Sequence, residues 1–320
     1  MWFRNLQIYR LEDDWKMAPG SLEAVLASHR LQPCGPLAWS SRGWVAPGDS
    51  GALVESVDRH LLLALGVEQK LLPASVIADR ARTFAQEWER SHGVKPGRKL
   101  KREFKDRAAT ELLPRALTRR RTLRAWIDPT RRRLVCDSAS PAAAELATEA
   151  LRDDLDELNL SLPTAQRAPD DTLSAWLRSG SAGPGFILGD ECELTGSDET
   201  RPILRYQRHP LPTPELRQHL DSGFRASRLG LVWRDRLSFV VDAKLQLKKL
   251  RFLDIDESDK ATESPEAERF AAELALMTGT CTAMIDELFA AMDVDTSATP
   301  PGEMRPRSQD ALEAPGVGTR

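Results

Sequence analysis

The sequence has few of the residues that build metal sites and disulfide frameworks. Its four cysteines, Cys34, Cys136, Cys192 and Cys281, lie far apart, and no Cys-x-x-Cys pair or closely spaced histidine accompanies them. Zinc ligands usually come in close sequence pairs, so neither a metal nor another cofactor is expected. We expect buried, reduced thiols of the kind found in a reducing compartment.

Long apolar runs and aromatic side chains are also scarce. The longest apolar run, Leu61–Val67, suits a buried strand and is far shorter than the roughly 20 residues of a membrane-spanning helix. Met1–Arg10 alternates polar and apolar residues and lacks the apolar core of a signal peptide. Aromatic residues make up 6% of the chain, too few for an obvious platform on which single-stranded bases stack. These absences predict a cytoplasmic protein without a membrane partner.

Positive charge is concentrated in one part of the chain. Arg80–Arg133 holds eighteen Lys or Arg against six Asp or Glu, although the whole chain has a formal net charge of −3. Solvated surfaces usually mix both signs, so this surplus indicates a polyanionic partner, DNA or RNA. The sequence has no helix-turn-helix, zinc-finger or RNP pattern. We therefore expect duplex DNA to be held by its backbone, with little sequence preference.

Turn residues and apolar periodicity divide the chain into four predicted parts, which together give an α+β fold with antiparallel sheets. Residues 1–73 are predicted to form a small α+β unit, and residues 74–117 a basic helical hairpin with one packed side and one cationic side. Residues 118–295 are predicted to form a second α+β unit with a β-meander and a long final helix, Pro265–Met292. Residues 296–320, rich in Pro, Gly, Ser and Thr, are predicted to be disordered.

Two glycine-rich loops resemble parts of enzyme sites. Gly48–Gly51 matches the nucleophile loop of chymotrypsin-type proteases, but the only histidine before it, His29, falls in a predicted helix. Gly180–Gly185 lacks the Gly-Lys-Ser/Thr ending of a P-loop and precedes a strand. We interpret both as tight turns.

A third motif leaves an enzymatic alternative open. Asp242-Ala243-Lys244 resembles the acidic-x-Lys core of a family of Mg²⁺-dependent nucleases, in which a carboxylate holds the metal and Lys steadies the attacking water. Such a site needs a second acidic residue on a neighbouring strand, a role open to Asp235. A nuclease that uses Asp242 and Lys244 is therefore one alternative, and an RNA-binding protein is another.

Short blocks that occur in order over most of the chain resemble the bacterial recombination-associated RdgC family. Each block is short, and their joint order and spacing make the match specific. The blocks are Trp2–Leu6 with Tyr9–Leu11, Pro33–Gly35 with Gly43–Val45, Lys70–Pro73, Leu112–Ala116, Trp126–Asp128, Ala175–Ala182, Leu247–Phe252 and Leu276–Gly279.

The resemblance implies a specific architecture and function. RdgC proteins are α+β homodimers whose two curved subunits meet at both ends and close a ring with a positively charged hole wide enough for duplex DNA. They bind DNA without marked sequence preference, restrain RecA-dependent strand exchange and have no catalytic activity. The resemblance therefore predicts a non-enzymatic, nucleoid-associated ring that encircles double-stranded DNA, antagonises RecA and acts in recombination and replication fork repair.

The predicted DNA contacts follow the basic segment, with a second group near the C-terminal meander. They are Arg98, Lys99, Lys101, Arg102, Lys105, Arg115, Arg119, Arg120, Arg121 and Arg124, and in the second group Arg208, Lys248, Lys249 and Arg251. By the family resemblance, contacts that close the ring lie near Leu117, where members often carry Phe, and on the polar loop at Arg208 and His209.

Overall fold

One antiparallel sheet of twelve strands runs through the described part of the chain. The computed structural model describes residues 2–155, 157–253 and 266–295, so the predicted tail, 296–320, lies outside the described residues. The strand order is β2-β4-β5-β6-β1-β12-β11-β10-β8-β9, with β3 beside β4 and β7 beside β1. The predicted α+β class with antiparallel pairing is confirmed. Strands from the predicted first and third parts share this one sheet.

The elements have the following bounds. The strands are β1 (Leu6–Leu11), β2 (Ser40–Val45), β3 (Glu55–Val57), β4 (His60–Leu71), β5 (Leu117–Asp128), β6 (Arg133–Asp137), β7 (Leu160–Ser161), β8 (Phe186–Thr195), β9 (Ile203–Gln207), β10 (Arg225–Trp233), β11 (Leu237–Asp242) and β12 (Leu247–Phe252). The helices are α1 (Pro19–Ser28), α2 (Ala74–His92), α3 (Arg98–Leu112), α4 (Pro141–Asp154), α5 (Pro169–Ser179), α6 (Pro214–Asp221) and α7 (Glu266–Ala291), with a 3₁₀ turn, η1, at Leu113–Arg115.

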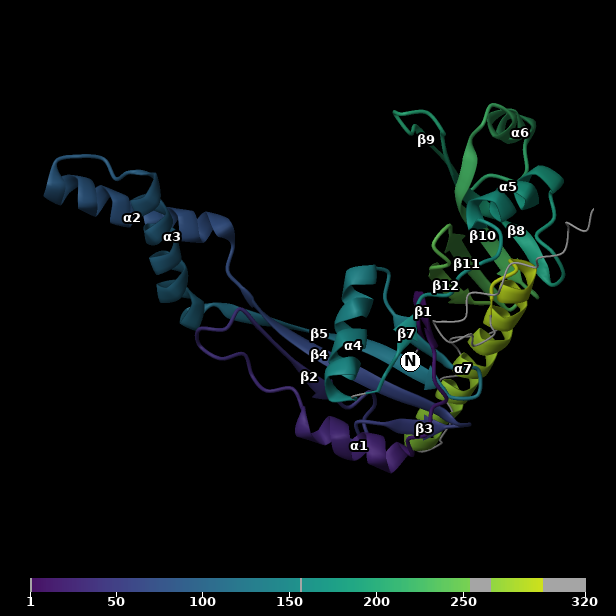
Figure 1. The fold of residues 1–320 in the computed structure, drawn as a ribbon, viewed down its shortest axis with the longest axis horizontal. Coiled ribbons are helices and arrows are strands. Elements are labelled where there is room, and N and C mark those ends of the chain that lie inside the picture. The colour runs from purple at the N-terminus through teal and green to yellow at the C-terminus, as the bar shows by residue number, and fades with distance from the viewer. Residues whose placement is uncertain (1, 156, 254–265, 296–320) are drawn as a thin grey trace, which may run out of the picture.

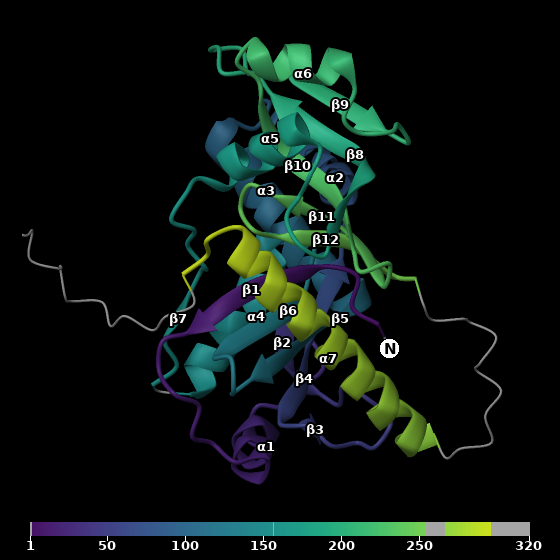
Figure 2. The same ribbon diagram turned by 90° about the vertical axis from the view of Figure 1, so that its right-hand side faces the viewer.

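The two faces of the sheet are covered by different helices. Along β4, Leu61 and Leu63 pack with α1 and α4, whereas Leu62 packs in the cluster that contains α7, because neighbouring side chains of a strand point to opposite faces. α7 contributes Leu274 and Met277 to that cluster, both fully buried. Figure 2 shows α7 lying across the sheet. The apolar side of α7 is therefore part of the core.

The two halves of the sheet meet at a narrow junction. β1 and β12 share the single register pair Leu6–Leu247, supported by the backbone hydrogen bond from Leu250 N to Arg4 O (2.9 Å). The α7 cluster takes side chains from both halves, so this helix bridges the junction. Residues 268–291 are long and apolar enough to cross a membrane by length and composition, but half of the most apolar stretch is buried inside the molecule.

The helical hairpin projects from the sheet as an arm. β4 and β5 pair without interruption from Leu61–Ile127 to Leu71–Leu117, and their outer ends lead into α2 and α3. The hairpin has a small core of its own, in which Phe84 faces Phe104 at a ring-centroid distance of 6.1 Å. Figure 1 shows the arm and the lobe that carries β9 and α6 rising on opposite sides of an open gap, which gives the subunit a curved outline.

The strand β2 was not predicted from the sequence. Ser40, Ser41 and Arg42 interrupt the apolar pattern, and Trp44 is the one large side chain of β2 that is buried. The strand forms because it pairs with β4 on one side, while residues 29–31, which follow α1, hydrogen-bond to its other side. There, Leu31 N donates to Trp44 O (3.0 Å) and Trp44 N donates to His29 O (2.9 Å).

We predict that Gly43→Ala destabilises the fold because of this close approach. A Cβ at Gly43 would lie 2.5 Å from Leu31 Cα and 2.7 Å from the carbonyl carbon of Arg30, both backbone atoms. Overpacking of this kind costs about 1–3 kcal/mol, to be measured as the free energy of unfolding in urea. Gly20→Ala is the matched control, since its Cβ would meet no atom within 4 Å. Equal stability of the two variants would contradict the described packing.

Candidate nucleic-acid interface

The helix α3 carries exposed cations on its outer side, and its opposite side is packed. Phe104 and Ala108 are buried against α2. Arg98, Arg102 and Lys105 follow at spacings of four and three residues, so they share the opposite face of the helix and are exposed. Lys99 and Lys101 flank this face and are exposed as well. The predicted division of the hairpin into a packed side and a cationic side is therefore confirmed.

These five α3 cations make no ion pair with any described residue. Other cations of the hairpin hold the arm together instead. Arg80 pairs with Glu111 (2.7 Å), and the Arg107 guanidinium lies 4.3 Å from the centre of the Phe84 ring. Arg82 pairs with Asp79, its neighbour one turn away. The positive charge on the outer side of α3 is therefore not neutralised by neighbouring carboxylates, which leaves it available to an external anion.

The arginines of β5 point to two different faces. Arg119 and Arg121 lie opposite Gln69 and Val67 of β4, on the face that packs against α1 and α4 further along the strand. Both are exposed and form no ion pair with a described residue. Arg115, in the 3₁₀ turn before β5, is likewise exposed and unpaired within the described chain.

The alternate arginines, Arg120 and Arg124, lie on the other face. Arg120 pairs with Glu68 (3.1 Å), and the backbone N–H of Cys34 also donates to that carboxylate (2.9 Å). Hydrogen bonds from the Cys34 N–H, which has the larger effect, and from Arg120 lower the pKa of Glu68, so Glu68 remains ionised. Arg124 is half-buried beside Pro47 in the cavity below the first turn of α7. The four β5 arginines, predicted as one group of DNA contacts, therefore form two pairs on opposite faces of the sheet.

The arginines at the end of the basic segment form ion pairs within the subunit. Arg131 and Arg133 both pair with Asp286 of α7, at 2.6 and 2.5 Å, and the Arg133 guanidinium lies 5.0 Å from the centre of the Phe289 ring. These contacts fasten α7 to the turn between β5 and β6. Within the basic segment, the exposed cations that have neither an ion pair nor a hydrogen-bond acceptor among the described residues therefore run from Lys95, just before α3, to Arg121 in β5.

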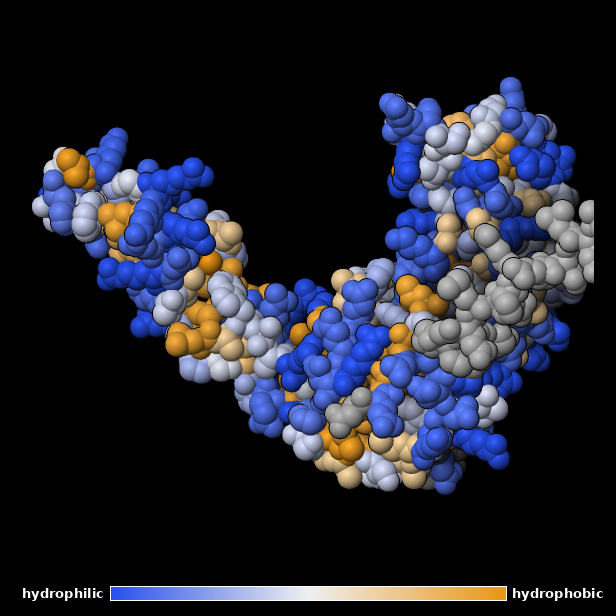
Figure 3. Space-filling view, viewed as in Figure 1, coloured by the Kyte–Doolittle hydropathy of each residue, from blue (hydrophilic) through white to orange (hydrophobic). Residues whose placement is uncertain are grey.

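A second basic surface lies on the lobe across the gap. Arg208, which follows β9, and Lys249 and Arg251, which both belong to β12, line one cavity of about 360 Å³. Figure 3 shows hydrophilic surface on this lobe and on the arm, on both sides of the gap. Lys249 pairs with Glu191, however, and Lys248 pairs with Asp242 (3.1 Å).

The residues predicted to close a ring lie on opposite lobes of the subunit. Leu117 is 78% exposed at the base of the arm, beside its cross-strand neighbour Leu71, which is 49% exposed. Arg208 and His209 lie at the end of β9, where His209 N donates to Asp190 O (3.0 Å). The two predicted contact regions therefore do not meet within one subunit.

The geometry around Asp242 does not favour the nuclease alternative. One carboxylate oxygen of Asp242 accepts from the backbone N–H groups of Lys244 (2.9 Å) and Gln246 (3.0 Å), and the other pairs with Lys248. Asp235 lies in the turn at the far end of β11, a strand-length away. No group of three metal-ligating side chains occurs among the described residues. Asp242 is therefore explained as the acceptor that shapes the turn before β12.

The two glycine-rich loops are turns, as predicted. Gly180, Gly183 and Gly185 all have positive φ, between 79° and 83°, which other residues rarely adopt. In the other loop, the Ser50 hydroxyl donates to Glu55, and a Cβ at Gly48 would lie 2.7 Å from the Phe270 ring. Both loops thus have a structural explanation.

Comparison with known proteins shows which family this chain resembles. The family model described as "Putative exonuclease, RdgC" matches residues 1–295. The chain is 40% identical over 299 residues to a recombination-associated protein RdgC of Cupriavidus pinatubonensis, covering 93% of this chain and 100% of that protein. A protein of the same name from Dechloromonas aromatica is 39% identical over 297 residues, covering 91% and 97% of the two chains. The chain belongs to the RdgC family.

Membership of the RdgC family confirms the resemblance inferred from the sequence blocks. The names of these relatives associate them with recombination, whereas the description of the family model mentions an exonuclease. The RdgC match ends at residue 295, where the described residues also end. The family thus covers the arm, the sheet and α7 together.

We predict that Asp242→Ala lowers stability and leaves DNA cleavage unchanged at the background level. Loss of its carboxylate leaves the buried N–H of Gln246 without an acceptor, at a cost of about 1–3 kcal/mol in the free energy of unfolding. Asp190→Ala, exposed on the same lobe, is the control. Linear duplex incubated with Mg²⁺ and either variant or the unaltered protein should stay intact. Cleavage that disappears in Asp242→Ala alone would restore the nuclease alternative.

Proposed function

We propose that this protein is a non-enzymatic, sequence-independent double-stranded DNA-binding protein that acts as a ring-shaped homodimer and restrains RecA-dependent recombination. The observation that carries the proposal is the row of exposed cations on α3, continued by Arg115, Arg119 and Arg121, which have no carboxylate partner among the described residues. Recombination-associated relatives of nearly the same length support the biological setting.

Phosphate contacts explain how such a surface binds DNA. Lys and Arg side chains displace condensed counterions from the phosphates, and this release makes binding strong at low salt and weak at high salt. Backbone contacts carry no direct sequence information. The same cations would bind RNA phosphates, so competition between duplex DNA and duplex RNA of equal length separates the DNA proposal from its RNA alternative.

The curved subunit supports a ring. A second copy related by two-fold symmetry would close the gap between the arm and the opposite lobe, and each contact would use matching surfaces of the two copies. Exposed Leu117 and Leu71 provide apolar surface at the base of the arm, and the Arg208–His209 loop provides polar surface on the opposite lobe. Arg208, Lys249 and Arg251 would then border the hole as secondary DNA contacts.

Encirclement gives the proposed mechanism. A closed ring slides along the duplex by exchanging phosphate contacts, but it leaves the DNA only at an end or by opening. A bound ring therefore occupies duplex that a RecA filament would otherwise invade, without contacting bases or RecA. This mode of action fits a cytoplasmic, nucleoid-associated protein that limits recombination at replication forks.

We predict that Arg98→Ala/Arg102→Ala/Lys105→Ala weakens binding to a random-sequence duplex by roughly tenfold or more at moderate salt. The log–log salt slope should become less steep by about 0.9 for each lost phosphate contact. The control, Arg82→Ala/Arg90→Ala/Arg120→Ala, removes the same charge from residues that already have an acceptor. Fluorescence anisotropy titrations measure both quantities. Equal losses in the two triple variants would show that net charge, rather than the α3 surface, governs binding.

We also predict that Leu117→Asp opens the ring. The unaltered protein should have the mass of two subunits by light scattering. It should remain bound to circular DNA during a high-salt wash, and it should be released when the same DNA has been linearised. Burying a charge at an apolar contact is costly, so Leu117→Asp should lose retention on the circle. Leu276→Asp, 54% exposed on α7, is the control. A monomeric mass, or equal retention on both DNA forms, would refute encirclement.

A further inference from the structure

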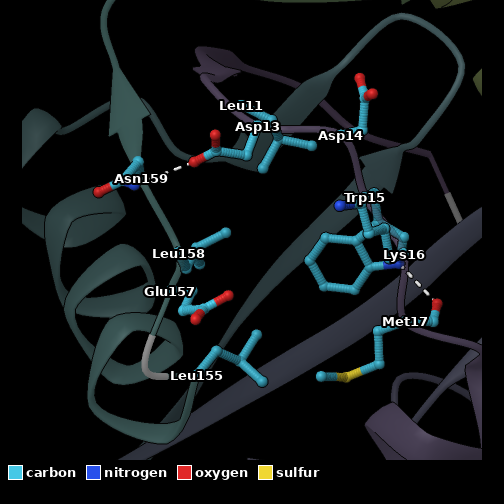
Figure 4. Close-up of a pocket in the computed structure, with 10 residues that line it drawn as sticks. All are labelled: Leu11, Asp13, Asp14, Trp15, Lys16, Met17, Leu155, Glu157, Leu158 and Asn159. Atoms are coloured by element: carbon cyan, nitrogen blue, oxygen red, sulfur yellow. Dashed lines mark hydrogen bonds between the residues drawn. The ribbon is translucent and has the colours of Figure 1, made fainter. Parts of the chain in front are cut away.

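A cavity of about 700 Å³ lies at the end of β1, next to the C-terminal end of α4. Figure 4 shows the residues that line it, which come from the loop after β1 and from the segment after α4. Apolar side chains and carboxylates alternate around it. The lining residues are Leu11, Asp13, Asp14, Trp15, Lys16, Met17, Leu155, Glu157, Leu158 and Asn159.

The Trp15 ring contributes an apolar surface to this cavity, and its N–H already has a hydrogen-bond acceptor. Its indole N–H donates to Met17 O (2.8 Å), so the one polar atom of the side chain is already satisfied within the loop. The ring is half-buried, and Figure 4 shows it extending across the cavity toward Leu158 and Glu157. Its exposed surface suits aliphatic groups and cations, which aromatic rings attract through their quadrupole.

The charge around the cavity is predominantly negative. Asp13 accepts from the Asn159 side-chain amide (3.0 Å), and Asp14 pairs with Arg132 (3.5 Å). Glu157 is exposed, has no partner among the described residues, and in Figure 4 lies between Leu158 and Leu155, across the cavity from the Trp15 ring. Three carboxylates thus border the cavity against one cationic lining residue. Nucleic acid is repelled here, so this surface is chemically distinct from the α3 surface.

We propose that the cavity is a docking site for a protein partner, which inserts a short peptide segment with a Lys or Arg next to a large apolar side chain. The apolar side chain fills the space lined by Leu11, Leu155 and Met17. The cation lies against the Trp15 ring and pairs with Glu157, the carboxylate without an internal partner. Because carboxylates flank the apolar lining residues, the cavity fits a peptide in which cationic and large apolar side chains alternate. A volume of this size holds several side chains.

The test uses the full chain and a fluorescein-labelled peptide with the central sequence Arg-Leu-Arg between Gly and Ser residues, followed by fluorescence anisotropy. Saturable binding is expected. Glu157→Gln should weaken it about tenfold, since a charge-assisted hydrogen bond contributes in this range. Glu199→Gln, an exposed carboxylate on the opposite lobe, should leave the affinity unchanged. Both variants should bind duplex DNA like the unaltered protein, which separates this proposal from the proposed function.

Two further peptides decide what the cavity recognises. An Arg-Ser-Arg peptide should bind at least fivefold more weakly, because the apolar space stays empty, and a Glu-Leu-Glu peptide should not bind. Equal binding of Arg-Leu-Arg and Arg-Ser-Arg would reduce the effect to general charge attraction and overturn the proposal. So would an unchanged affinity in Glu157→Gln, or tight binding of the Glu-Leu-Glu peptide.

Discussion

Burial of the apolar side of α7 against both halves of the sheet is the constraint on which the curved subunit depends. The halves share one register pair between β1 and β12, too few hydrogen bonds to fix their relative orientation. Leu274, Met277 and Leu288 are fully buried beneath this junction. Each such side chain stabilises the packed arrangement by about 1.5–3 kcal/mol. Hydrophobic burial does not favour one orientation of α7, whereas the ion pairs of Arg131 and Arg133 with Asp286 do.

Charge segregation follows from that geometry. Carboxylates of the body neutralise the cations closest to it, as Glu68 does for Arg120 and Asp286 does for Arg133. The arm extends beyond their reach because β4 and β5 continue past the core as a ribbon. Cations at the end of such an arm keep their full charge, since Coulomb attraction to distant carboxylates is screened within about 10 Å at ordinary ionic strength. An acidic protein thereby presents a basic surface.

The acidic cavity beside α4 places the opposite charge on a different part of the same subunit. Its carboxylates belong to loops that follow β1 and α4, whereas the proposed DNA-binding cations lie on α3, on η1 and in the outer half of β5. A surface for a polyanion and a surface for a cationic peptide can therefore be occupied together. In the proposed ring, such a division would let the protein hold DNA and contact a basic partner at the same time.

Local patterns were sufficient for much of this architecture. The helical hairpin predicted for residues 74–117 contains α2 and α3, and its predicted cationic side is the exposed side of α3, because helix periodicity is a property of neighbouring residues. The alternation of strand side chains could also have separated Arg119 from Arg120. The polar strand β2 had no such signal, since it forms through pairing on both of its sides.

The sequence by itself therefore determined the family, the α+β class and the surplus of positive charge in the middle of the chain. The tertiary structure alone decided which of those charges remain free. Glu68 and Asp286 neutralise Arg120 and Arg133 through contacts that exist only in the folded chain. Ion pairing depends on distances of a few ångströms between side chains, and those distances are set by strand register and helix packing.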